Sequence, residues 1–212
     1  SIPFLYLIYL WNGIVPVKTQ LANPNTITNL SRLSELYFIN IGYATTMISF
    51  YLLPLIFLKP NLDFNLKKFI SKKNNLIMIL FAFCYILFLL IYFDFKKYTV
   101  DDYWVGLGYV DKISKILFTN LIIREYFTYF SFFVSWLILI FFLDKKISNY
   151  LIILYFYFIS ILLWPLMQEY FDPLIIIFGM MMFLPKIKVN FYNSIFIIFY
   201  FSIFILSANI YY

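Results

Sequence analysis

The stretch NLIMILFAFCYILFLLIYF, residues 75–93, contains no Asp, Glu, Lys or Arg. An apolar run of about 20 residues is long enough to cross the ~30 Å hydrocarbon core of a bilayer as an α-helix. Runs of similar character recur along the chain, at about 35–58, 126–143, 150–164, 173–185 and 193–210, with a shorter one at 2–11. The pattern predicts an all-α polytopic membrane protein with about six to seven transmembrane helices. Segment 173–185 is short and bounded by prolines, so it is an alternative candidate for a half-spanning helix.

The composition agrees with this prediction. Of the 212 residues, 64% are hydrophobic and 12% charged, whereas a soluble domain has roughly 45–50% apolar and about 25% charged residues. These values exclude a water-soluble globule and favour one transmembrane helical domain over 1–212. Because the chain opens with Ser1 inside an apolar run, we expect it to be the C-terminal portion of a longer protein.

The chain has no histidine, and Cys84 is its single cysteine. These counts exclude a Ser-His-Asp triad, a disulfide framework and a metal cluster of His and Cys ligands. Any chemistry must use carboxylates, amides, hydroxyls, Lys and Arg, and no metal ligands are assigned. Cys84 lies in the middle of an apolar run, so we expect it to serve helix packing.

The charges predict how the chain is oriented. If the apolar runs alternate in direction, one side of the membrane receives 59–74, 144–149 and 185–192, and the other receives 12–34, 94–125 and 165–172. The first side carries nine cations and two anions, and the second, counted together with Glu35 at the edge of the next apolar run, carries seven cations and eight anions. By the positive-inside rule the first side is cytoplasmic. Orientation and contact with anionic lipid headgroups explain the net charge of +6, so no nucleic-acid partner is predicted.

The acidic and amide residues therefore gather on the extracytoplasmic side, in three clusters. The first cluster, 11–35, contains turn-forming Asn, Gly and Pro residues with Lys18 and Arg32, which are candidates for pairing with a phosphate. The alternative is a solvated connection between two helices.

The second cluster, 93–115, holds Asp101, Asp102 and Trp104. Carboxylates accept hydrogen bonds from sugar hydroxyls, and a Trp ring stacks on the apolar face of a pyranose. The alternative is an interfacial aromatic belt with solvated acids. A divalent cation is a second candidate ligand of the two aspartates, although the sequence supplies no further oxygen ligands at a defined spacing.

The third cluster, 162–178, places Glu169 and Asp172 in a short connection between two apolar stretches. Acids so close to lipid are costly unless they are paired or hydrated, which makes them functional candidates. Arg124 lies at the start of the 126–143 helix and faces the same side, where it is a candidate partner for either acid or for a substrate phosphate. The alternative is a structural ion pair or snorkelling side chains at a helix end.

Three short motifs stand on this face: NGIV at 12–15, DDYW at 101–104 and PLMQEYFDP at 165–173. In order and spacing they resemble the C-terminal half of the GT-C superfamily of polytopic glycosyltransferases, with the nearest likeness to the dolichyl-phosphate-glucose α-1,2-glucosyltransferases. The likeness covers nearly the whole chain. DDYW and PLMQEYFDP lack the Arg and His residues that the family has in the corresponding motifs.

The resemblance implies transfer of a hexose from a polyprenyl- or dolichyl-phosphate donor on the extracytoplasmic face of a bacterial inner membrane or the endoplasmic reticulum. The catalytic acid would lie in an upstream loop outside this chain. The residues implied to bind the donor are Lys18, Arg32, Asp101, Asp102, Trp104, Arg124, Glu169 and Asp172. A transporter, a lipid-linked sugar flippase and a polysaccharide polymerase remain alternatives. The first two are disfavoured because the runs at 75–93 and 193–210 contain no Asp, Glu, Lys or Arg.

Overall fold

The computed structural model describes residues 36–56, 73–98, 108–143, 146–163 and 191–211, together with residues 166, 172 and 175. Every secondary-structure element in this part of the chain is an α-helix, which confirms the all-α prediction. The helices are α3 (Ile39–Ile56), α5 (Lys73–Tyr92), α6 (Phe95–Tyr98), α7 (Gly108–Leu117), α8 (Leu121–Phe142), α9 (Ile147–Leu162) and α11 (Phe191–Tyr211).

The long helices coincide with the predicted apolar runs to within a few residues. The largest difference is at α8, which begins at Leu121 rather than at 126. The connection 94–125 also folds more than its polar composition suggested, because α6 and α7 lie within it. The run at 2–11 and nearly all of 173–185 lie outside the described residues.

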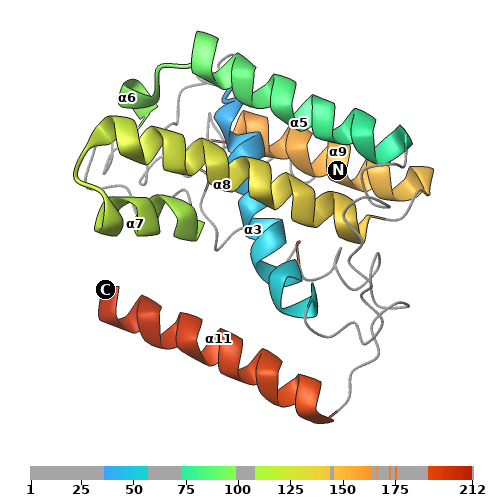
Figure 1. The fold of residues 1–212 in the computed structure, drawn as a ribbon, viewed down its shortest axis with the longest axis vertical. Coiled ribbons are helices and arrows are strands. Elements are labelled where there is room, and N and C mark those ends of the chain that lie inside the picture. The colour runs from blue at the N-terminus through green and yellow to red at the C-terminus, as the bar shows by residue number, and fades with distance from the viewer. Residues whose placement is uncertain are drawn as a thin grey trace, which may run out of the picture.

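Helix α3 is the central helix of the described bundle. It packs against α7, α8, α9 and α11, while α5 and α7 pack against α8. Figure 1 shows α5 running along α8 in the opposite direction and α3 crossing behind α8. The long helices α5, α8 and α9 alternate in direction, so the end of α5, α6, α7, the start of α8 and the end of α9 gather at one end of the molecule (Figure 1).

The start of α3 is fastened to the end of α9 at this same end. The backbone N–H of Tyr37 donates to the carbonyl of Ile161 at 2.9 Å, and the Asn40 side chain donates to the carbonyls of Ser160 and Leu163. The last carbonyls of a helix have no partner within the helix. Asn40 therefore supplies from α3 the hydrogen bonds that the end of α9 lacks.

Close contact between α3 and α8 depends on Gly42. A Cβ atom at this position would collide with the ring of Phe132, which is fully buried. Tyr43 packs edge-to-face on the same ring, with centroids 4.9 Å apart. Small residues that let backbones approach are typical of helix contacts in membranes.

The described helices bury ten polar or charged side chains beside an apolar core that includes Tyr43, Met47 and Phe132, and they expose many large apolar side chains. The buried polar side chains are Asn40, Thr45, Thr46, Ser49, Asp111, Ser114, Thr128, Ser135, Asn149 and Ser160. Large apolar side chains instead cover the outer faces of α5, α8, α9 and α11, with Phe81 and Ile91 each 70% exposed. Cys84 is also exposed, so the expectation that it serves packing within the chain was wrong.

By length and composition, two of the described helices are able to cross a membrane: Asn74–Tyr92, with a mean hydropathy of 2.5, and Leu121–Phe142, with 1.6. Three shorter apolar helices span Ile39–Leu55, Ile147–Leu162 and Ser194–Leu206. The expected total of six to seven transmembrane helices stays a prediction.

Candidate functional site

The candidate site lies at the start of α8. The side chain of Asn120 accepts a hydrogen bond from the backbone N–H of Ile122 at 2.9 Å and so caps the helix. This cap fixes the start of α8 at Leu121 and brings Arg124 to the first turns, where the exposed N–H groups already carry partial positive charge. No acidic residue in the first turn of α8 offsets that charge.

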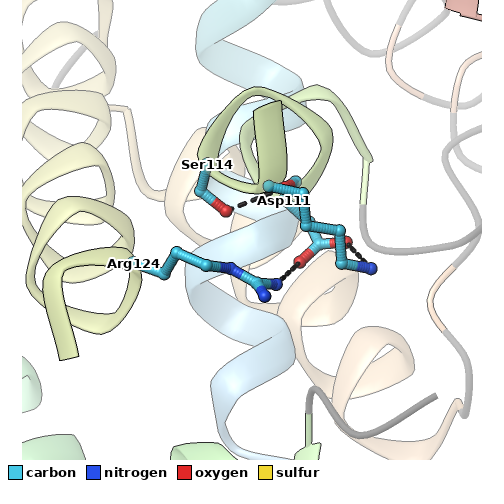
Figure 2. A network of polar contacts seen from close by, with 4 residues as sticks. Asp111, Ser114 and Arg124 are labelled. Carbon is cyan, nitrogen blue, oxygen red and sulfur yellow. Dashed lines mark hydrogen bonds and ion pairs between the residues drawn. The ribbon is translucent and has the colours of Figure 1, made fainter. Parts of the chain in front are cut away.

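The neutralising carboxylate comes from α7. Asp111 is 2% exposed, and its Oδ2 lies 2.9 Å from Nζ of Lys115, one turn later on the same helix. Its Oδ1 lies 3.7 Å from Nη2 of Arg124 (Figure 2). Gly108 begins α7 with φ at 73°, a conformation that other residues rarely adopt. The glycine therefore lets the chain turn into α7 directly before this buried acid.

We call Asp111, Lys115 and Arg124 the ion cluster. Among the described residues, Nε and Nη2 of Arg124 are buried and have no hydrogen-bond partner. The hydroxyl of Thr128, one turn further along α8, is also buried without one. Buried donors of this kind are nearly always satisfied in folded proteins. With two cations and one carboxylate, the cluster has the charge and the free donors to take up an anionic group.

Two titratable side chains near the ion cluster, Tyr43 and Glu125, lie within range of different charges. The hydroxyl of Tyr43 on α3 lies within range of the charges of both Asp111 and Arg124. Glu125 follows Arg124 in sequence, but it lies within range of Asp94 at the end of α5. The two adjacent residues Arg124 and Glu125 thus belong to different electrostatic surroundings.

A groove of about 230 Å³ runs between α3, α7 and α8, next to the ion cluster. Its lining is mostly apolar, and its hydroxyl groups already have partners in the protein. Ser49 bonds to Ser135 at 2.8 Å, Ser131 donates to a carbonyl of its own helix, and Tyr109 donates to a carbonyl of α3. Burial raises the pKa of Tyr109 to about 12, although a hydrogen bond with Ser49 opposes the shift. The groove therefore offers an apolar surface.

The structure describes two of the eight predicted site residues. Arg124 is in the ion cluster, and Asp172 is half-buried with helical backbone. The others, Lys18, Arg32, Asp101, Asp102, Trp104 and Glu169, lie outside the described residues, and so does the predicted cation site at the two aspartates. Whether these residues converge with Arg124 stays a prediction.

The acid that the structure places at Arg124 is Asp111, which sequence reasoning did not single out. The spacing of residues 108–117 does predict a helix with an ion pair. Asp111 and Lys115 are four residues apart, and Val110, Ile113 and Leu117 recur with helical period. Within the described residues, no group of three or more His, Cys, Asp or Glu side chains is placed to hold a metal ion.

Comparison with protein-family models, with curated proteins and with solved structures finds no match for this chain. The function is therefore argued from the chain's own residues and their geometry.

Proposed function

We propose that this chain is a polytopic integral membrane protein that binds a polyprenyl-phosphate-linked sugar on the extracytoplasmic face. In this proposal it forms the donor side of a membrane glycosyltransferase. The large apolar side chains exposed on the described helices, above all on α5, are the observation that carries the membrane assignment. The unfilled donors of Arg124 support a phosphate ligand, and the motif resemblance at 12–15, 101–104 and 165–173 supports sugar transfer.

Helix α5 illustrates why a bilayer is the best solvent for this fold. Only 11% of its apolar 18-residue window is buried, whereas an equally apolar helix in the core of a soluble protein would be mostly buried. In water, exposed apolar patches larger than a few hundred Å² are rare and favour association. In hydrocarbon the same surface is well solvated, and the polar groups are expected at helix contacts.

The sidedness of the charges supports the same proposal. The end of the molecule that holds the ion cluster also holds the start of α3, the end of α5, the start of α8 and the end of α9, which adjoin in sequence the connections counted as extracytoplasmic (Figure 1). The opposite end holds the start of α5, the end of α8 and the start of α9, which adjoin the basic connections in sequence. Placed in a bilayer, the fold would therefore present the ion cluster on the extracytoplasmic face and the lysine-rich connections to the cytoplasm.

Arg124 is suited to bind the phosphate of the donor. Its guanidinium has free Nε and Nη2 donors, and these two groups together match two oxygens of a phosphate. The apolar groove beside the cluster provides a surface for hydrocarbon. A ligand with an anionic head and an apolar tail fits both features.

The membrane topology can be tested with single cysteines. In a Cys84→Ser background, Thr119→Cys and Ser148→Cys place thiols at exposed positions near opposite ends of α8 and α9. We expect a membrane-impermeant maleimide to label Thr119→Cys in intact cells and Ser148→Cys only after permeabilisation. Labelling of both variants from the same side would refute the topology. Unchanged Cys84 should resist the same reagent in membranes and react once the protein is dissolved in SDS.

Donor binding can be tested on the purified protein in maltoside micelles, which contain no phosphate. The probe is a polyprenyl-phosphate-linked hexose. We expect Arg124→Met to weaken its binding tenfold or more, because a hydrogen bond to a charged group contributes about 1.5–3 kcal/mol and about 1.4 kcal/mol is tenfold. Lys146→Met, which removes an exposed cation near the other end of the molecule, is the matched control and should bind as the unchanged protein does.

The outcomes of this experiment separate the parts of the proposal. If Arg124→Met binds the probe normally, the phosphate does not lie at Arg124. If the protein binds polyprenyl phosphate and its hexose derivative equally well, it does not recognise the sugar, and the transferase assignment fails while the phosphate site stands.

A further inference from the structure

The carboxylate of Asp111 lies at different distances from its two cationic neighbours. It makes a hydrogen-bonded ion pair with Lys115 at 2.9 Å, but it stays 3.7 Å from Arg124, beyond hydrogen-bond distance. The acid is almost completely buried and the side chain of Arg124 is only 14% exposed. Two opposite charges this close inside a protein would normally close into a short contact.

A short contact with Asp111 would reduce the number of hydrogen-bond donors that Arg124 can offer to a ligand. A carboxylate and a guanidinium prefer a bidentate pair with two parallel hydrogen bonds. In such a pair Asp111 would occupy donors of Arg124 that are now free, Nη2 among them. Lys115 competes for the same carboxylate and holds it on α7.

We propose that Lys115 is a positioning residue that keeps Asp111 from closing on Arg124, so that the guanidinium remains available to an anionic ligand. The part of this proposal that concerns the ligand rests on the proposed function, in which the ligand is the phosphate of a polyprenyl-linked donor. Lys115 itself does not contact the ligand; it acts through Asp111. When the ligand binds Arg124, Lys115 continues to neutralise Asp111.

Binding of a short-chain polyprenyl phosphate in maltoside micelles tests the role of Lys115. We expect Lys115→Met to weaken binding about tenfold, because the released carboxylate pairs with Arg124. Lys115→Arg should retain binding to within about threefold. Lys112→Met removes a cation from the same helix and is the matched control.

The informative variant is the double substitution Asp111→Asn with Lys115→Met, which leaves the net charge unchanged. If Lys115 acts by restraining Asp111, the double variant should recover binding to within about threefold of the unchanged protein. If the double variant binds no better than Lys115→Met, the proposal is overturned. Unchanged binding by Lys115→Met overturns it as well.

A direct observation of Arg124 separates this inference from the proposed function. The chain has two arginines, so in an Arg32→Lys background the ¹⁵N spectrum contains one arginine Nε–H signal. We expect that signal to move downfield in Lys115→Met, as a hydrogen bond to Asp111 forms, and to return in the double variant. If the signal behaves in this way while the protein that keeps Arg32 binds no polyprenyl phosphate, the positioning role stands and the ligand assignment fails. A signal that does not move refutes the positioning role, whatever the protein binds.

Discussion

Replacing Gly42 by alanine tests the closest contact between α3 and α8. The added Cβ would overlap Cγ, Cδ2 and Cε2 of the Phe132 ring, which is fully buried and held edge-to-face by Tyr43. Overpacking of this kind costs about 1–3 kcal/mol, and three overlapping ring atoms put this site near the upper end. Alanine regains about 1 kcal/mol of helix propensity over glycine. We therefore expect Gly42→Ala to lower the free energy of unfolding by about 2 kcal/mol.

The assay is equilibrium unfolding by SDS in mixed micelles, followed by far-UV circular dichroism. Ser202→Thr adds one methyl group at an exposed position of α11 and is the matched control, with an expected change below about 0.5 kcal/mol. Phe132→Leu should relieve the clash, so the double variant should be more stable than the sum of the two single changes by about 1 kcal/mol. Additivity within about 0.5 kcal/mol would refute the reasoning, because it would show that the two residues are not in contact.

Three further predictions concern the buried polar groups. Asn40→Leu keeps the size of the side chain but removes the donor of the Leu163 carbonyl and one of the two donors of the Ser160 carbonyl, so it should lower the free energy of unfolding by about 2 kcal/mol; a loss below about 0.5 kcal/mol would contradict this. The hydrogen bond between Ser49 and Ser135 should give a coupling of about 0.6 kcal/mol in a double-mutant cycle with alanine, and zero coupling would show that the bond contributes nothing. The folded-state pKa of Tyr109 is raised to about 12, above its ordinary value of about 10. Its contribution to stability is therefore complete below pH 10 and is lost as the pH rises through 12. The difference in phenolate absorbance between the unchanged protein and Tyr109→Phe should titrate near pH 12, and a midpoint near 10 would refute its burial.

The long helices were predictable because their sequences leave little choice. The run at 75–93 has apolar side chains on all faces; in α5 one face packs against α8 and the other faces are exposed. Their ends were less predictable. Arg124 and Glu125 are charged, so the start of α8 was placed after them, whereas the cap at Asn120 starts the helix earlier. A charged first turn is compatible with helix when a neighbouring segment supplies the opposite charge.

The ion cluster shows what sequence reasoning missed. Asp111, Lys112 and Lys115 made 108–117 look like part of a solvated connection. In the structure Asp111 and Ser114 point inward, while Ile113, Ile116 and Leu117 are exposed. Because the polar face of α7 is the buried one, the usual association of charge with solvent failed. Arg124 was selected as a site candidate from its place at a helix start, whereas its ion-pair partner Asp111 depends on the packing of α7 on α8.

The many polar contacts of α3 have a consequence for how the protein is made. The hydroxyls of Ser49 and Thr45 meet partners that lie 86 and 112 residues further along the chain. At about 5–20 residues per second, a ribosome needs about 4–17 s to synthesise the first of these intervals. During that time α3 exists before α8 and α9 have been made, and these side chains lack their final partners. Assembly of the bundle is therefore a late event in biosynthesis, and a truncated chain that ends before α8 should be a substrate for cellular quality control.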